Sequence, residues 1–283
     1  GHACGHNLLG AGAAAAACAL KADMEKTGAP GTLRVYGCPA EEIMSGKIAM
    51  NQAGVFDDLD IAVTWHPFDR NRVSNDIWQA QDIKNYTFHG VSAHASRSPE
   101  DGRSALDAAE LMNVGVNYLR EHVISDARIH YAYLDAGGTA PNVVQSQAAL
   151  HYFVRAPLST QALEIAERVK DVAKGAAIMT GTKVQIEVLS GMSNLVMNDT
   201  LNQLLYEAFL AVGGPKFDAQ DKALAAKFYR ELLPQQKATA EQEWKRRYGQ
   251  THSLHDAPLF EDINVYRTPE TILVDPGSTD VGD

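Results

Sequence analysis

In the first 80 residues, stretches that favour helices, the first of them rich in alanine, alternate along the chain with short, largely apolar stretches typical of strands. Strands that alternate with helices are typical of a mainly parallel sheet with helices packed against it. We therefore expect an α/β fold whose catalytic sheet is mainly parallel and flanked by helices, with Asn7 as the first N-cap and Gly28 as the stop of the first helix. The predicted elements are helices over 7–26 and 47–53 and strands over 32–38 and 60–65.

The middle of the chain has a different pattern. Its predicted elements follow the order β-α-β-β-α-β, which is the split order of a ferredoxin-like module. We expect a four-stranded sheet with helices on one face, inserted into the first domain. The predicted strands are 83–90, 129–134, 148–154 and 183–189, and the predicted helices are 104–123 and 160–176.

The last third returns to helical patterning. A helix is predicted over 200–212, the charged stretch 216–247 is predicted as a solvated helical hairpin, and 272–274 as a short strand. The predicted domain organisation is therefore a catalytic domain in two parts, 1–80 and 191–283, separated by a ferredoxin-like block at 81–190.

Composition and charge narrow the class of partner. The 283 residues are 45% hydrophobic and 21% charged, which is ordinary for a globular protein and argues against disorder or a collagen-like repeat. Asp and Glu number 35 against 25 Lys and Arg, so the net charge is −10. Because nucleic acids bind basic surfaces, we expect no nucleic-acid partner.

The longest apolar stretch, 8–20, is mostly alanine and too short to cross a bilayer, so no membrane association is expected. Three cysteines are too few for a disulfide framework, which predicts a reducing compartment, the cytoplasm. The abrupt first and last residues predict an interior piece of a longer protein.

Three short features carry candidate chemistry. Cys4 and His6 precede a predicted helix, Glu41 and Glu42 follow a predicted strand, and His66 follows another. The carboxyl ends of parallel strands form the ligand crevice of an α/β sheet, and sulfur, nitrogen and oxygen donors bind zinc, manganese or cobalt. Taken singly, the thiol–imidazole pair is more often incidental, the Glu pair is more often a solvated helix start, and a His before Pro is usually a turn residue. Spacing alone favours a metal site about as much as these purely structural roles.

Several sequence runs, in order along the chain, resemble the aminoacylase/carboxypeptidase family of binuclear metallopeptidases, in its amidohydrolase branch. The resemblance covers nearly the whole chain, and the middle block matches the family's lid and dimerisation domain. The runs are GHACGHN, GCPAEE, TWHP, GVSAHAS and PNVVQ.

The resemblance implies a role for each matching residue. It implies one or two divalent ions, zinc or manganese, with cobalt as an alternative. His94 matches a residue that reaches into the neighbouring protomer's site and steadies an oxyanion. The implied metal ligands are Cys4, His6, Glu42 and His66, the implied general base is Glu41, and the implied holders of the substrate carboxylate are Asn142 and Arg155.

The reaction implied is hydrolysis of an amide between an acyl or aroyl group and an amino acid, with p-aminobenzoyl-glutamate as the candidate substrate. A homodimer through the lid, or pairing with a related second chain, is implied as well. A dipeptidase or carboxypeptidase, and a non-catalytic dimeric partner, remain alternatives. Residues 278–280 match the family's GS-x-D motif, and the last metal ligand of the family, a His downstream of it, is absent.

Overall fold

A computed structural model describes the chain apart from residues 1–3, 42–45, 69, 249–258, 268–273 and 276–283. The chain divides into two compact units. Unit 1 comprises Gly1–Gly37, Leu59–Asp76 and Met197–Leu273, and unit 2 comprises Cys38–Asp58, Ile77–Val196 and Val274–Asp283. Two of the divisions, 76/77 and 196/197, lie within six residues of the predicted boundaries at 80/81 and 190/191, but 38–58 and 274–283, predicted as parts of the catalytic domain, are grouped with unit 2.

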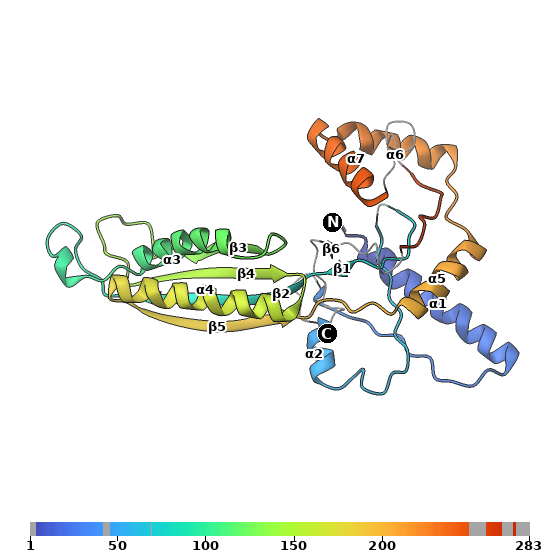
Figure 1. The fold of residues 1–283 in the computed structure, drawn as a ribbon, viewed down its shortest axis with the longest axis horizontal. Coiled ribbons are helices and arrows are strands. Elements are labelled where there is room, and N and C mark those ends of the chain that lie inside the picture. Colours follow the sequence, from blue (N-terminus) through green and yellow to red (C-terminus); the bar gives the residue numbers. More distant parts are fainter. Residues whose placement is uncertain (1–3, 42–45, 69, 249–258, 268–273, 276–283) are drawn as a thin grey trace. The chain divides into compact units, whose positions relative to one another are not determined.

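Unit 2 contains a four-stranded antiparallel sheet with two helices on one face (Figure 1). The strand order is β3-β4-β2-β5, so the first and third strands of the block are neighbours at the centre of the sheet. The predicted β-α-β-β-α-β order is confirmed, with boundaries that differ by a few residues. The elements are β2 (Ala80–His89), α3 (Ala105–Leu119), β3 (Arg128–Asp135), β4 (Gln147–Ala156), α4 (Ser159–Thr180) and β5 (Lys183–Met192).

The core of unit 2 lies between the sheet and these helices. Tyr86 and Phe88 of β2 and Leu150 of β4 are essentially inaccessible to solvent and belong to one cluster with α3 and α4. Ala105 and Ala109 of α3 are also fully buried, and such small residues let the helix backbone lie close to the sheet. Alternate residues of β2 and β4 point to the opposite face, which carries no helix of this cluster.

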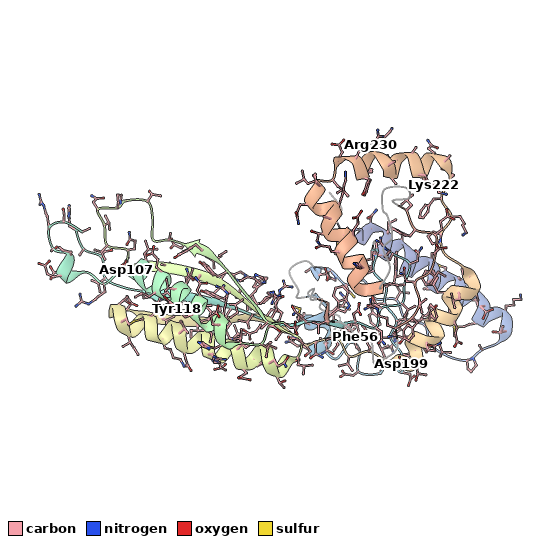
Figure 2. All side chains as sticks on the ribbon, turned by 45° about the horizontal axis from the view of Figure 1, so that its top comes forward. Phe56, Asp107, Tyr118, Asp199, Lys222 and Arg230 are labelled. Carbon is pink, nitrogen blue, oxygen red and sulfur yellow. The ribbon has the colours of Figure 1, made fainter. Side chains whose placement is uncertain are left out.

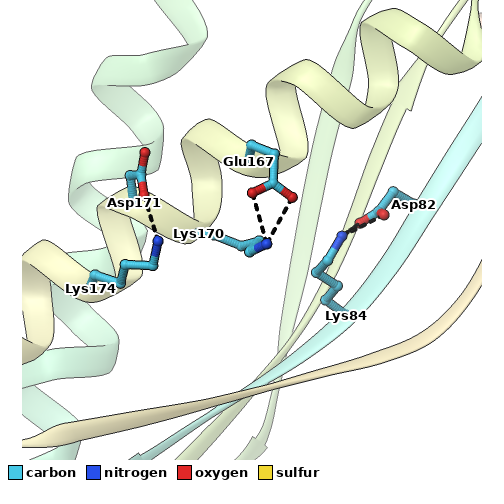
Figure 3. A network of polar contacts seen from close by, with 6 residues as sticks. All are labelled: Asp82, Lys84, Glu167, Lys170, Asp171 and Lys174. Carbon is cyan, nitrogen blue, oxygen red and sulfur yellow. Dashed lines mark hydrogen bonds and ion pairs between the residues drawn. The ribbon is translucent and has the colours of Figure 1, made fainter.

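A buried ion pair also lies on the helix-covered side of β2. Lys84 donates to the carboxylate of Asp82, and both side chains are at least nine-tenths buried (Figure 3). On the neighbouring turns of α4, Lys170 binds Glu167 at 2.8 Å at the surface. The buried pair is the costly one to break, because a lone charge there would be left without water or a counter-ion.

The regular secondary structure in the described part of unit 1 consists of helices. Its helices are α1 (His6–Thr27), α5 (Asp199–Val212), α6 (Ala219–Glu231) and α7 (Pro234–Tyr248). The predicted helical hairpin is confirmed as α6 and α7, which are two residues apart. Asp199 lies at the start of α5 (Figure 2). It accepts a hydrogen bond from the Tyr266 hydroxyl at 2.6 Å, which ties a late segment of the chain to this helix.

The first helix begins one residue earlier than predicted. Gly5, at φ 77°, is its N-cap, so the prediction of Asn7 as N-cap is wrong. Gly28, in the left-handed conformation, ends the helix as predicted. None of the described helices combines the length and the apolar character that crossing a bilayer would require.

The predicted mainly parallel sheet is wrong for the described residues. Segments 32–38 and 60–65 form no strand, and the parallel ladder between β1 (Ile77–Trp78) and β6 (Val274–Asp275) is two residues long. A strand forms only where the backbone of a neighbouring segment takes up its N–H and C=O groups in a regular ladder. The apolar side chains of the two segments are correspondingly exposed, 57% for Val35 and 64% for Val63.

Candidate metal centre and active site

Three of the predicted metal ligands converge in unit 1. Ligand atoms of Cys4, His6 and His66 all lie within 4.8 Å of one another. Cys4 Sγ lies 3.3 Å from His66 Nε2, and the rings of His6 and His66 meet edge to face with centroids 5.6 Å apart. Residues 62 positions apart therefore present one sulfur and two ring nitrogens to a common point.

A backbone contact fixes which ring nitrogen of His66 is available as a ligand. Its Nδ1 lies 2.6 Å from the carbonyl oxygen of Pro67, and a carbonyl can only accept a hydrogen bond. Nδ1 therefore carries the proton, and the lone pair of Nε2 faces Cys4. This arrangement, in which one ring nitrogen donates to a carbonyl and the other is free to bind, is typical of histidines that ligate metals.

The first turns of α1 hold His66 in place through its neighbours. The indole nitrogen of Trp65 donates to the carbonyl oxygen of Leu9 at 3.1 Å. The ring of Trp65 lies so close to Gly12 that a Cβ there would be 2.5 Å from Cζ2. On the other side, Pro67 packs against Gly5. The glycines at and near the start of α1 thus contact the 65–67 segment. The sequence pattern had predicted that this helix would pack against a sheet.

The donor set fits a divalent transition metal. One thiolate and two imidazoles are the ligands of many zinc sites, and they suit zinc and cobalt better than magnesium or calcium. Glu42 lies outside the described residues. Glu41 is half-buried and belongs to unit 2. Both carboxylates therefore remain predictions as ligand and base.

In unit 2 the loops that carry His94 and Asn142 are joined. The N–H of Ala95 donates to the carbonyl oxygen of Asn142 at 3.0 Å, and His94 forms an isolated antiparallel bridge with Val143. Sequence separation offered no sign of this pairing, because the two loops lie far apart along the chain. Their side chains are therefore presented from one short, backbone-fixed platform beyond the start of β4.

Arg155 lies at the other end of β4. It is paired with Gln81 on one side and with Arg128 on the other. Gln147, at the opposite end, is the first residue of the strand. Arg155 is eight positions after Gln147 along the strand, which corresponds to about 26 Å. Within one copy of the chain, Arg155 and Asn142 therefore cannot reach the same carboxylate.

Arg155 stands in a positively charged neighbourhood. Burial lowers the pKa of its guanidinium. The pKa of His130 is lowered by desolvation, and further by the charges of Arg155, Arg120 and Arg128. The side chains of Arg155 and His130 point away from the helix-covered face of the sheet. Such a surface favours an anion, which agrees with the carboxylate-binding role predicted for Arg155.

The chain is similar to known proteins over most or all of its length. The family model "Peptidase family M20/M25/M40" matches residues 1–267. One of the subunits of p-aminobenzoyl-glutamate hydrolase from Escherichia coli (strain K12) is 40% identical over 288 aligned positions, which cover 100% of this chain and 60% of that protein. Xaa-Arg dipeptidase from Mus musculus is 35% identical, over 71% of this chain and 47% of that protein.

A crystal structure of an aminobenzoyl-glutamate utilization protein from Klebsiella pneumoniae is similar in fold, with a TM-score of 0.50 and 27% identity over 60% of this chain and 44% of that one. The present chain spans about 60% of the length of the Escherichia coli relative. With the Cys4–His6–His66 cluster and a family match that covers most of its residues, the chain belongs to the peptidase family M20/M25/M40.

Proposed function

We propose that this chain is the greater part of a metal-dependent amidohydrolase that cleaves N-acyl or aroyl amino acids. The observation that carries the proposal is the convergence of Cys4, His6 and His66, with the Nε2 lone pair of His66 turned toward the shared point. Membership of a peptidase family supports cleavage of an amide bond.

Cys4, His6 and His66, together with Glu42, would hold one or two divalent ions. A bound ion of this kind lowers the pKa of its water and polarises the scissile carbonyl. Glu41 accepts the proton of the attacking water and then delivers it to the nitrogen of the leaving amine. A base that neighbours a ligand in sequence can reach this water without giving its own charge to the ion.

The block from β2 to β5 would serve as the lid and dimerisation domain. His94 donates a hydrogen bond to the developing oxyanion, and Asn142 binds the substrate beside it. Because Arg155 lies about 26 Å farther along β4, we assign His94 and Asn142 to the site of the partner copy and Arg155 to the other site that the lid meets. An Arg binds a carboxylate with two parallel hydrogen bonds, which suits the free carboxylate of an amino acid.

p-Aminobenzoyl-glutamate is the substrate that we propose, with p-aminobenzoate and glutamate as products. The support is the 40% identity to a protein named for that hydrolysis. A dipeptidase is the second candidate, because Xaa-Arg dipeptidase is 35% identical. A related second chain, in place of a second copy, agrees with the 30% identity to another subunit of the Escherichia coli hydrolase. The exposed thiol of Cys4 must stay reduced to ligate, so we infer a cytoplasmic setting.

Metal content and hydrolysis of the full-length protein test the proposal together. Cys4→Ser should lose bound zinc or manganese by elemental analysis, whereas Cys18→Ser, which alters an exposed thiol of α1, should keep it. Equal metal content in these two variants would exclude the cluster as the site. With p-aminobenzoyl-glutamate, an alanyl-arginine dipeptide and N-acetyl-glutamate as substrates, preference for the dipeptide would favour the second candidate.

Glu41→Gln separates the base from the ligands. It should abolish turnover and leave the metal content nearly unchanged, because an amide cannot accept the proton of water. Loss of metal together with activity would mean that Glu41 is a ligand. Mixed dimers of His94→Ala and Glu41→Gln chains should regain activity at one of their two sites; no recovery would argue against a site shared between copies.

A further inference from the structure

Backbone hydrogen bonds hold the residues next to His94 and His94 itself in place. Ala93 accepts a hydrogen bond from the N–H of Val144 at 3.0 Å. The carbonyl oxygen of His94 itself accepts from the N–H groups of Arg97 and Ser98, each at 3.1 Å. The His94 side chain is nevertheless exposed. A surface imidazole on so constrained a loop contributes little to folding and can be held in one orientation for recognition.

Ser96 contacts only one of the two ring nitrogens of His94. Its backbone N–H lies 3.3 Å from Nδ1, and its Oγ lies 3.2 Å from the same atom. A backbone N–H can only donate, so Nδ1 must be the acceptor and must carry no proton. A neutral ring holds one proton, which therefore resides on Nε2.

We infer that Ser96 is a positioning residue that selects the Nε2–H tautomer of His94 and directs this N–H outward as the hydrogen-bond donor for the anionic oxygen of the reaction. The inference rests on the proposed function for the role of the oxygen, but the tautomer follows from the loop alone. An oxyanion needs a donor that is already protonated and aligned before charge develops. The opposite tautomer would present a lone pair to that oxygen and repel it.

Nitrogen NMR of the full-length protein tests the tautomer without reference to activity. Histidine labelled with ¹⁵N shows through its two-bond proton couplings which ring nitrogen is protonated, and the His94→Gln spectrum identifies the His94 signals. At pH 8 we expect the Nε2–H form in the wild type. A predominant Nδ1–H form would overturn the inference, whether or not the protein hydrolyses any substrate.

Ser96→Ala keeps the backbone donor and removes the hydroxyl. We expect a measurable population of the Nδ1–H form and a fall in kcat of about two- to tenfold, which corresponds to one neutral hydrogen bond, with KM little changed. Ser96→Thr should restore both readouts. Ser98→Ala is the matched control, because the Ser98 backbone, and not its hydroxyl, contacts His94. Unchanged tautomer populations in Ser96→Ala would show that the hydroxyl plays no part.

Two replacements of His94 report on the donor position itself. The amide nitrogen of Gln can lie where Nε2 lies, whereas that of Asn corresponds to Nδ1. His94→Gln should therefore retain at least about tenfold more turnover than His94→Asn, within the 10²–10³-fold range typical of one oxyanion donor. Equal loss in both variants, with the Nε2–H tautomer confirmed by NMR, would reject the donor role and leave the tautomer assignment standing.

Discussion

Gly12→Ala should weaken metal binding although residue 12 touches no ligand. An added Cβ would lie 2.5 Å from Cζ2 and 3.0 Å from Cε2 of Trp65, whereas non-bonded carbon atoms rest at about 3.5–4.0 Å. The indole must therefore move by about 1 Å. That movement stretches its hydrogen bond to Leu9 and displaces His66, the next residue in the chain.

The energetic cost follows from the same contact. Overpacking costs about 1–3 kcal/mol, and replacing Gly by Ala inside a helix returns about 1 kcal/mol. Gly12→Ala should therefore be neutral to about 2 kcal/mol less stable than the wild type. Gly10→Ala is the matched control, because nothing lies within 4 Å of its added Cβ, and it should stabilise the protein by about 1 kcal/mol.

Isothermal titration of the metal-free full-length protein with zinc measures the functional effect. Displacement of a group that orients a ligand typically costs 10–100-fold in metal affinity, and we expect a loss in this range for Gly12→Ala. Gly10→Ala should bind zinc as the wild type does. Equal zinc affinity in the two variants would refute the link from the α1 surface through Trp65 to His66.

Three further changes test the packing of unit 2. Lys84→Met leaves the buried carboxylate of Asp82 without its cation and should lower the free energy of unfolding in urea by about 3–5 kcal/mol. Lys170→Met breaks a surface ion pair and should lower it by under about 1 kcal/mol. Comparable losses in the two variants would show that the Lys84–Asp82 pair is exposed to solvent. Relative to the wild type, His130→Gln should be increasingly more stable as the pH falls below the ordinary His pKa of 6.5, and equally stable at pH 8. The reason is that a folded-state pKa below the unfolded one makes protonation of His130 destabilise the fold. A stability difference that does not change with pH would contradict this. Asn113 accepts a hydrogen bond from the buried hydroxyl of Tyr152 at 2.5 Å. Asn113→Ala removes this acceptor and should lower the free energy of unfolding, measured by heat or urea, by about 1–3 kcal/mol. A loss no larger than that of an alanine substitution at the surface would argue against the bond.

The elements of unit 2 could be read from the sequence because their stabilising contacts are local to the block. Alternation in β2 and β4, and helical periodicity in α3 and α4, are satisfied by one another within 77–196. The strands predicted at 32–38 and 60–65 depended on neighbours that periodicity cannot supply. A pattern shows that a segment suits a strand, but only a partner backbone makes it one.

The candidate site was predictable in its residue types and not in its geometry. Resemblance indicated Cys4, His6 and His66, and the structure brings their ligand atoms together. No sequence pattern indicated that Ser96 contacts His94 or that Trp65 lies on Gly12, because both contacts depend on how loops close. The distance between the 142 loop and the far end of β4 is likewise a property of strand length, which a set of matching motifs does not contain.

The length of β4 sets the distance between the loop that carries Asn142 and Arg155. Side chains alternate along a strand, so inserting one residue between Gln147 and Arg155 would turn the guanidinium toward the helices and change the facing of every residue after it. Inserting two would keep its facing and lengthen the span by about 6.6 Å. Relatives in which these two sites lie farther apart should therefore differ from this chain in β4 by steps of two residues, because an odd step would require a compensating bulge.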